Sequence, residues 1–213
     1  MRTIVIHRDW LFAKGQFSLP EVLSGSERYK TVQLPHDYMI GEDVHADAVP
    51  GPASGYYCTG VAHYTKMVMI PAEWENEQVG LAFDGVMMNA TVFINGCKVA
   101  LQHYGYTPFY VDITEYILFG RENRITVGVN PSMQPNSRWY SGAGLFRGIS
   151  LVHKPMLAIR ENGIYGVTER IEYDGDRNPL RAFLRIRTEI ENKTMQNKMA
   201  AVTVRLCREG KSE

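Results

Sequence analysis

Alternation of apolar and polar residues is the strongest pattern along the chain. It recurs in short segments rich in Val, Ile, Phe, Tyr and Thr, which are bounded by Gly, Pro, Asn or Asp. A period of two places successive side chains on opposite faces of a β-strand, so these segments predict strands with one buried face. Many short strands at this spacing predict an all-β sandwich or barrel. The predicted strands before residue 153 are 64–70, 79–83, 90–94, 98–101, 109–113, 124–129 and 145–152.

Local turn chemistry predicts one hairpin and almost no helix. Asn95-Gly96 separates two of the predicted strands, and both residues tolerate the positive φ of a type I′ turn. A helical pattern is confined to about one turn at 114–118, with Asp112 or Thr114 as the expected cap. The connections between strands are therefore expected to be turns and loops.

Two long loops and one boundary divide the chain. The segments 34–55 and 131–144 are rich in Pro, Gly and aromatic residues, and long loops in a compact domain are usually functional. His153-Lys154-Pro155 indicates a domain boundary. Beyond it, further strands are predicted at 163–170, 180–191 and 199–207. About 60 residues are too few for a second sandwich of ~100 residues. We therefore expect a whole domain over 1–153 and the first strands of an incomplete one over 154–213.

Composition narrows the function classes. The 213 residues carry 23 Lys and Arg against 23 Asp and Glu, so no basic excess supports nucleic-acid binding. No apolar run approaches the ~20 residues that cross a membrane. Cys58, Cys97 and Cys207 are too far apart for a disulfide framework or a metal cluster, which predicts buried or half-buried thiols in a reducing compartment. The opening residues lack a secretory signal. A cytoplasmic location is expected, with a secreted or periplasmic one as the alternative.

Four motif clusters, taken in their order, resemble the N-terminal sugar-binding domain of family 2 glycoside hydrolases. They are Leu34-Pro35-His36-Asp37; Gly55-Tyr56-Tyr57 with Tyr64-Thr65-Lys66; Phe83-Asp84-Gly85-Val86 with Asn89-Ala90, Ile94-Asn95-Gly96, the run from His103 to Phe109 and Asp112-Ile113-Thr114; and the run from Ser137 to Arg147. The resemblance covers 5–153. The remainder is similar to the start of the immunoglobulin-like domain that follows in that family. The resemblance to the family implies a jelly-roll-like antiparallel β-sandwich, followed by a truncated immunoglobulin-like β-sandwich.

The resemblance places the catalysis outside this chain. The family includes β-galactosidases, β-glucuronidases and β-mannosidases, and it carries two carboxylates on a (β/α)₈ barrel. Such a barrel needs ~200 residues or more, which the remainder of the chain cannot supply. The dipeptide Asn76-Glu77 resembles the family's acid/base motif, but it lies in a polar connection and is read as a solvated turn. We expect no catalytic residue here, and a homo-oligomeric parent of the β-galactosidase type that cleaves terminal β-glycosides with retention.

Candidate residues fall into two groups. His36, Asp37, Asp84 and Asn89 are predicted to structure loops through turn chemistry and hydrogen bonds to buried backbone. Arg138, Trp139 and Tyr140 combine aromatic faces with a fixed donor, which is the chemistry of a sugar site. The alternative for this second group is a domain interface.

The sequence also allows other interpretations of two segments and of the whole chain. The aromatic run from His103 to Phe109 could stack on a ligand, although packing between the sheets is favoured. Asp43, His45 and Asp47 alternate within a loop, but no metal site or cofactor is expected. An autonomous, lectin-like carbohydrate-binding module and a purely structural docking domain are the alternatives to a part of a glycosidase.

Overall fold

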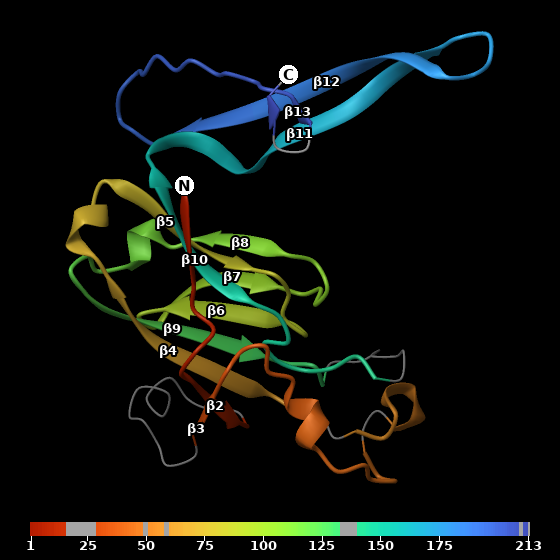
Figure 1. Ribbon diagram of the computed structural model, residues 1–213. Coiled ribbons are helices and arrows are strands. Elements are labelled where there is room, and N and C mark those ends of the chain that lie inside the picture. Colours follow the sequence, from red (N-terminus) through yellow and green to blue (C-terminus); the bar gives the residue numbers. More distant parts are fainter. Residues whose placement is uncertain (16–28, 49–50, 58–59, 133–139, 209–210, 213) are drawn as a thin grey trace. The chain divides into compact units, whose positions relative to one another are not determined.

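The chain forms two compact units, which are described separately (Figure 1). They are a sandwich unit, Met1–Pro155, and a hairpin unit, Met156–Glu213. The computed structural model describes residues 1–15, 29–48, 51–57, 60–132, 140–208 and 211–212. No helix in these described ranges is long and apolar enough to cross a membrane.

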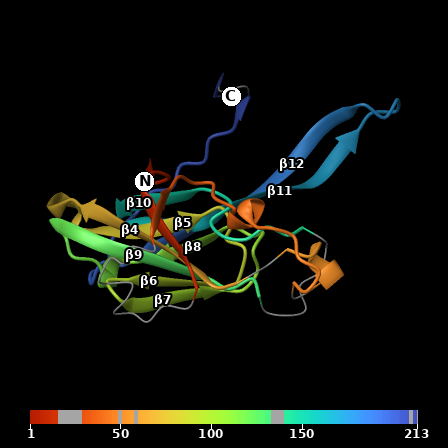
Figure 2. The ribbon, with the colours of Figure 1, turned by 90° about the horizontal axis from the view of Figure 1, so that it is seen from below.

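The sandwich unit consists of two antiparallel sheets stacked face to face (Figures 1 and 2). The first has the order β1 (Arg2–Val5), β10 (Ile149–Pro155), β5 (Glu77–Phe83), β8 (Phe109–Asp112). The second has the order β3 (Lys30–Val32), β2 (Trp10–Lys14), β4 (Ala62–Ile70), β9 (Arg121–Val129), β6 (Ala90–Ile94), β7 (Cys97–Gln102). The described parts of the loops between strands contain four short 3₁₀ turns, η1 (Tyr38–Gly41), η2 (Gly51–Ser54), η3 (Ala72–Trp74) and η4 (Thr114–Tyr116). The prediction of an all-β antiparallel sandwich is confirmed.

The core lies between the two sheets and follows the predicted alternation. On β6, Ala90, Val92 and Ile94 are fully buried, whereas Thr91 and Phe93 between them are half-buried. Burying apolar surface drives this packing at roughly 25 cal/mol per Å². The largest buried apolar side chains come from both sheets, from η1, from the residue after β8 and from the loop before β10: Trp10, Met39, Tyr64, Ile70, Leu81, Phe83, Ile94, Ile113, Ile125, Leu145 and Ile149.

The predicted Asn95-Gly96 hairpin is confirmed. Asn95 has φ 50° and Gly96 has φ 87°, both positive as a type I′ turn requires. Asn95 Nδ2 also donates to Asn123 Oδ1 at 2.8 Å, and Asn95 Oδ1 accepts from the Arg124 backbone amide at 2.9 Å. One residue therefore shapes the β6–β7 turn and ties it to β9.

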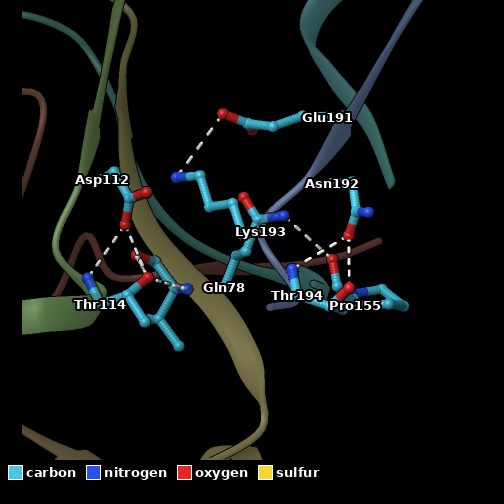
Figure 3. Close-up of polar contacts among 9 residues, drawn as sticks. Gln78, Asp112, Thr114, Pro155, Glu191, Asn192, Lys193 and Thr194 are labelled. Carbon is cyan, nitrogen blue, oxygen red and sulfur yellow. Dashed lines mark hydrogen bonds and ion pairs between the residues drawn. The ribbon is translucent and has the colours of Figure 1, made fainter. Parts of the chain in front are cut away.

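The single turn predicted near 114–118 is present as η4, but its N-cap position is Ile113, without a side-chain cap bond, and not the expected Asp112 or Thr114. Asp112 Oδ1 accepts from the amide of Thr114 at 3.0 Å and from its hydroxyl at 2.6 Å (Figure 3). Nearby, Gln78 Nε2 donates to the Pro155 carbonyl at 3.1 Å, which fastens the end of β10 to β5.

The hairpin unit is a long two-stranded ribbon, β11 (Leu157–Tyr173) paired with β12 (Pro179–Asn192). The short pair β13 (Cys207–Arg208) and β14 (Lys211–Ser212) follows. Asp174 shapes the tight turn by accepting from the amides of Asp176 and Asn178 at 2.9 and 2.8 Å. At the end of β12, the side-chain Oδ1 of Asn192 accepts from the backbone amide of Thr194 (Figure 3).

Four further expectations are wrong. The strand predicted at 145–152 begins only at Ile149, and the one predicted at 199–207 is not formed before Cys207, because no neighbouring strand pairs with 193–206. Cys97 and Cys207 are exposed rather than buried, and Cys58 lies outside the described residues. The core reading of the His103–Phe109 run holds for Phe109, which stacks on Phe83. It fails for Tyr104 and Tyr106, which are 60% and 44% exposed.

Candidate functional site

Two loops far apart in sequence join at one end of the sandwich unit. The backbone amide of His36 donates to the Leu145 carbonyl at 2.8 Å, and that of Tyr38 to the Ala143 carbonyl at 3.0 Å. The loop after β3 therefore runs beside the loop before β10, on the end of the unit that also carries the turns after β5 and β7 (Figure 1). Long-range pairing of this kind brings residues about a hundred positions apart into one site.

The carboxylate of Asp37 is the centre of this junction. Its Oδ1 accepts from the amides of Met39 at 3.0 Å and Ala143 at 2.9 Å, and its Oδ2 accepts from the Tyr140 hydroxyl at 2.7 Å. A Cβ at Gly142 would lie 2.8 Å from Oδ2, and this residue has φ 76°. Glycine is required there because it permits both the left-handed backbone and the close carboxylate. Charge-assisted bonds of this kind are stronger than neutral ones.

An aromatic floor supports the junction from the core side. The His36 ring packs on Phe12 at 4.8 Å between centroids, and its Nδ1 is hydrogen-bonded to the Tyr64 hydroxyl at 2.8 Å. A Cβ at Gly144 would lie 2.2 Å from the same hydroxyl, so the loop backbone rests directly on Tyr64. Burial lowers the pKa of His36 below its ordinary 6.5, against the opposing charge of Asp37. The imidazole is therefore neutral at pH 7, and the floor carries no charge.

Tyr140 presents a fixed aromatic face. Partial burial, followed by its hydrogen bond to the Asp37 carboxylate, raises the pKa of Tyr140 above the ordinary 10, so its hydroxyl remains a donor at neutral pH. The ring of Tyr57 meets it edge to face at 5.1 Å and 77°. Tyr140 is nevertheless 38% exposed. A half-exposed ring with its hydroxyl bonded and a second ring packed against it is a rigid apolar group beside a carboxylate.

The structure brings three of the candidate residues together and places two others nearby. His36, Asp37 and Tyr140 form the junction itself. Asn89, with φ 50°, lies at the next turn, where its side-chain Nδ2 donates to the Asn130 backbone carbonyl at 3.0 Å. Asp84 precedes Gly85, and its backbone carbonyl accepts from Arg147 at 3.2 Å. Arg138 and Trp139 lie outside the described residues.

Sequence reasoning assigned no role to Tyr57, Tyr64 or the two glycines at 142 and 144. Gly142 and Gly144 both have positive φ and both face an atom too close for a side chain. Their spacing around Ala143 was the available signal, because paired glycines often mark a backbone packed against another element. The contact of Tyr57 with Tyr140 joins residues on separate loops, and no local pattern predicts it.

A half-open cavity of about 370 Å³ lies elsewhere in the sandwich unit. Its wall includes Trp74 stacked on the His153 ring at 3.9 Å, and His153 is hydrogen-bonded to Glu77. None of the candidate residues lines it, so we place the site at the Asp37 junction rather than in this cavity. Its lining residues are Met1, Arg2, Glu73, Trp74, Glu77, His153, Lys154 and Pro155.

Comparisons with known proteins find relatives among the glycosidases. The β-galactosidase BoGH2A of Bacteroides ovatus is 30% identical over 91% of this chain and 22% of its own length. A β-glucuronidase of Formosa agariphila is 26% identical over 89% of the chain and 21% of its own length. The crystal structure of a β-glycosidase from Bacteroides vulgatus has 27% identity and a TM-score of 0.79, over 92% of this chain and 25% of that one.

The chain spans only about a fifth to a quarter of the length of these relatives. The family model that matches it is described as glycosyl hydrolases family 2, sugar binding domain, and covers residues 44–155, more than half of the chain. That range includes the Tyr140 loop and the strands that carry it. On this match and the similarity to BoGH2A, the chain belongs to glycosyl hydrolase family 2.

Proposed function

We propose that this chain is the non-catalytic, sugar-binding part of a cytoplasmic, retaining family 2 glycosidase that hydrolyses terminal β-glycosides. The end of the sandwich unit where Asp37 joins the two loops would face the terminal sugar. The observation that carries the proposal is the Asp37 carboxylate, which fixes the ring of Tyr140 through a 2.7 Å bond across 103 positions of sequence.

The chemistry of the junction suits a sugar. A pyranose offers apolar C–H faces and polar hydroxyl edges, so its site needs an aromatic face beside a few fixed polar groups. Tyr140 supplies the face, and its rotation is restricted by Asp37 and Tyr57. A preorganised ring loses little conformational entropy on binding. Arg138 and Trp139, just before Tyr140, are proposed as further contacts.

The catalytic carboxylates are proposed to lie outside these residues. A retaining glycosidase needs two carboxyl groups about 5 Å apart, flanking the scissile bond. Glu77, from the Asn76-Glu77 dipeptide, is hydrogen-bonded to His153, whose ring stacks on Trp74. That arrangement favours a structural role for Glu77.

The sugar is proposed to be a β-galactoside, with a β-glucuronide or a β-mannoside as the alternatives. Support comes from BoGH2A, a β-galactosidase with 30% identity over 91% of the chain. The β-glucuronidase of Formosa agariphila covers nearly as much of the chain at lower identity, which is why the alternative is kept.

Two measurements on the purified chain test the proposal. Nitrophenyl β-galactoside, β-glucuronide and β-mannoside should all remain intact, and hydrolysis of any of them would overturn the non-catalytic role and direct attention to Glu73 and Glu77. In NMR titrations with free galactose, glucuronate and mannose, one of the three sugars should shift the signals of Tyr140 and Ala143. Its dissociation constant should be in the millimolar range, which corresponds to about 4 kcal/mol of binding free energy. Tyr140→Ala should abolish these shifts.

The strength of binding separates the leading proposal from an autonomous carbohydrate-binding module. Tyr140 is exposed within the sandwich unit itself, which is the observation that keeps this second candidate. A dissociation constant below about 0.1 mM for the isolated chain would favour the autonomous module. If none of the three sugars shifts the signals of Tyr140 and Ala143, even at a concentration 100-fold above the expected dissociation constant, both the leading proposal and the autonomous module are contradicted.

A further inference from the structure

We propose a second sugar contact at the bend between β7 and β8, formed by the rings of Tyr104 and Tyr106. These two rings are named the tyrosine platform. The ligand class is a β-linked oligosaccharide, whose second sugar unit would lie on the platform while the terminal unit lies at Tyr140. The choice of ligand rests on the proposed function, whereas the platform itself is argued from its own contacts.

The bend is anchored at its centre. Gly105 is buried, and a Cβ there would lie 2.7 Å from Met87 Sδ and 3.1 Å from Met87 Cα. A glycine here lets the bend pack closely on the β5–β6 turn, because any side chain would displace Met87. Because the backbone is held inward at Gly105, the side chains on either side of it are directed to the surface, and both tyrosines are exposed.

Hydrogen bonds hold the bend on both sides of the glycine. The backbone amide of Asn89 donates to the His103 carbonyl at 3.2 Å, and the side-chain oxygen Oδ1 of Asn89 is hydrogen-bonded to His103 Nδ1 at 3.0 Å. On the other side, Arg147 Nη1 donates to the carbonyls of Tyr106 and Asp84, each at 3.2 Å. The backbone under both rings is thus fixed to two separate segments.

The rings themselves are open. Tyr104 is 60% exposed and Tyr106 is 44% exposed. They meet at 5.7 Å and 64°, and Phe146 meets Tyr106 at 6.0 Å and 80°. Tyrosine combines an apolar body with a polar tip and loses little entropy when it forms a contact. Exposed rings on a fixed backbone have the properties of a binding surface rather than of a core.

The platform continues into the Asp37 junction. The hydroxyl of Tyr106 donates to the Ser141 carbonyl at 3.4 Å, and Ser141 directly follows Tyr140. The segment from Tyr140 to Phe146 therefore links the two: Tyr140 belongs to the junction, and Ser141 and Phe146 contact the platform residue Tyr106. A saccharide of two or more units can contact both, and this continuity favours a carbohydrate over a protein partner.

The test compares one sugar with two on the purified chain. Dissociation constants are measured by NMR for free galactose, the sugar of the proposed β-galactoside, and for its β-linked disaccharide and trisaccharide. We expect the oligosaccharides to bind about tenfold more tightly and to shift the ring signals of Tyr104 and Tyr106. Tyr104→Ala should remove the tenfold gain and leave the monosaccharide constant unchanged. Tyr165→Ala, at a tyrosine with the similar exposure of 62%, is the matched control and should change neither constant.

The outcomes separate this inference from the proposed function. Equal affinity for one, two and three units, with no shift at Tyr104, overturns the platform while leaving the Tyr140 site intact. Platform shifts with oligosaccharides but none at Tyr140 support the platform and overturn the proposed terminal site. Loss of monosaccharide binding in Tyr104→Ala would also overturn the division into two contacts. Tyr106→Phe, which keeps the ring but removes the bond to Ser141, should retain at least part of the oligosaccharide gain.

Discussion

The sandwich unit and the hairpin unit share one sequence pattern and differ in what it buries. On β6 the apolar positions Ala90, Val92 and Ile94 are fully buried between two sheets. On β12 the apolar positions alternate just as regularly with arginine and glutamate, yet Leu184 and Ile186 are 47% and 41% exposed. The β11–β12 ribbon is a sheet of two strands, and within the described residues of the hairpin unit its apolar side chains remain partly exposed.

This difference shows that alternation specifies a strand and its faces, while burial depends on a second layer. A two-stranded hairpin is at best marginally stable in water, whereas stacked sheets with a filled core are independently stable. Ion pairs on the hairpin unit, such as Arg185 with Glu169, lie on exposed side chains and contribute little. We therefore expect most of the free energy of unfolding to reside in the sandwich unit.

The largest expected effect is on the free energy of unfolding, when one leucine in each unit is replaced by alanine. Leu81 on β5 is fully buried, so Leu81→Ala should lower the free energy of unfolding by about 2–5 kcal/mol through lost transfer energy and a cavity. Leu184→Ala on β12 should stay within about 0.5 kcal/mol, as exposed substitutions usually do. Urea unfolding followed by far-ultraviolet circular dichroism measures both. A cost for Leu184→Ala equal to that of Leu81→Ala would show that the hairpin face is buried in solution and would break the comparison.

A smaller effect compares two carboxylates that each accept three hydrogen bonds. Asp37 accepts across two loops, from residues up to 106 positions away, whereas Asp174 accepts only from Asp176 and Asn178 within its own turn. Asp37→Ala should speed amide hydrogen exchange at the distant Ala143 by about 10- to 100-fold, because a hydrogen bond to a charged group is worth about 1.5–3 kcal/mol.

The control for this experiment is Asp174→Ala. It should speed exchange only at its own turn, at Asp176 and Asn178, and leave every sandwich amide unchanged. Unaltered exchange at Ala143 in Asp37→Ala would mean that the loops are joined by their backbone bonds alone.

What the sequence predicted correctly was local. The bounds of β6, the type I′ turn at Asn95-Gly96 and the single helical turn after Asp112 follow from period-two patterning and from the residue preferences of turns. These rules involve neighbours in sequence, so they need no knowledge of tertiary contacts.

What the sequence did not predict was the partner of each segment. Val202, Val204 and Leu206 alternate like a strand but pair with no neighbour, so no strand forms there. At the candidate site, the residue preferences of turns predicted that Asp37 structures its own loop. Its bonds to Ala143 and Tyr140, however, depend on how two distant loops meet. The exposure of Tyr104 likewise depends on Gly105 meeting Met87.

The smallest expected effect is a difference in acid sensitivity between the two units. Burial lowers the pKa values of His36 and His63 in the sandwich unit below the ordinary 6.5, and residues 156–213 contain no histidine. Below pH 6.5 the unfolded chain therefore binds protons that the folded sandwich does not. The free energy of unfolding of the sandwich unit should decrease as the pH is lowered from 6.5, until the pH is below the folded pKa values. Urea midpoints at pH 7.5, 6.0 and 5.0 measure this slope, and His36→Asn, which can replace the Nδ1 bond, should flatten it.

The hairpin unit should respond only in stronger acid. Hydrogen bonds from Asn178 lower the pKa of Asp174 below its ordinary 3.8, so the contribution of this turn is present above pH 3.8 and is lost as the pH falls through the folded pKa. Its amide exchange, corrected for intrinsic rates, should stay constant from pH 7 to 5 while the sandwich weakens. Equal weakening of both units between pH 6.5 and 5 would mean that the histidines are not the cause, since only one unit contains them.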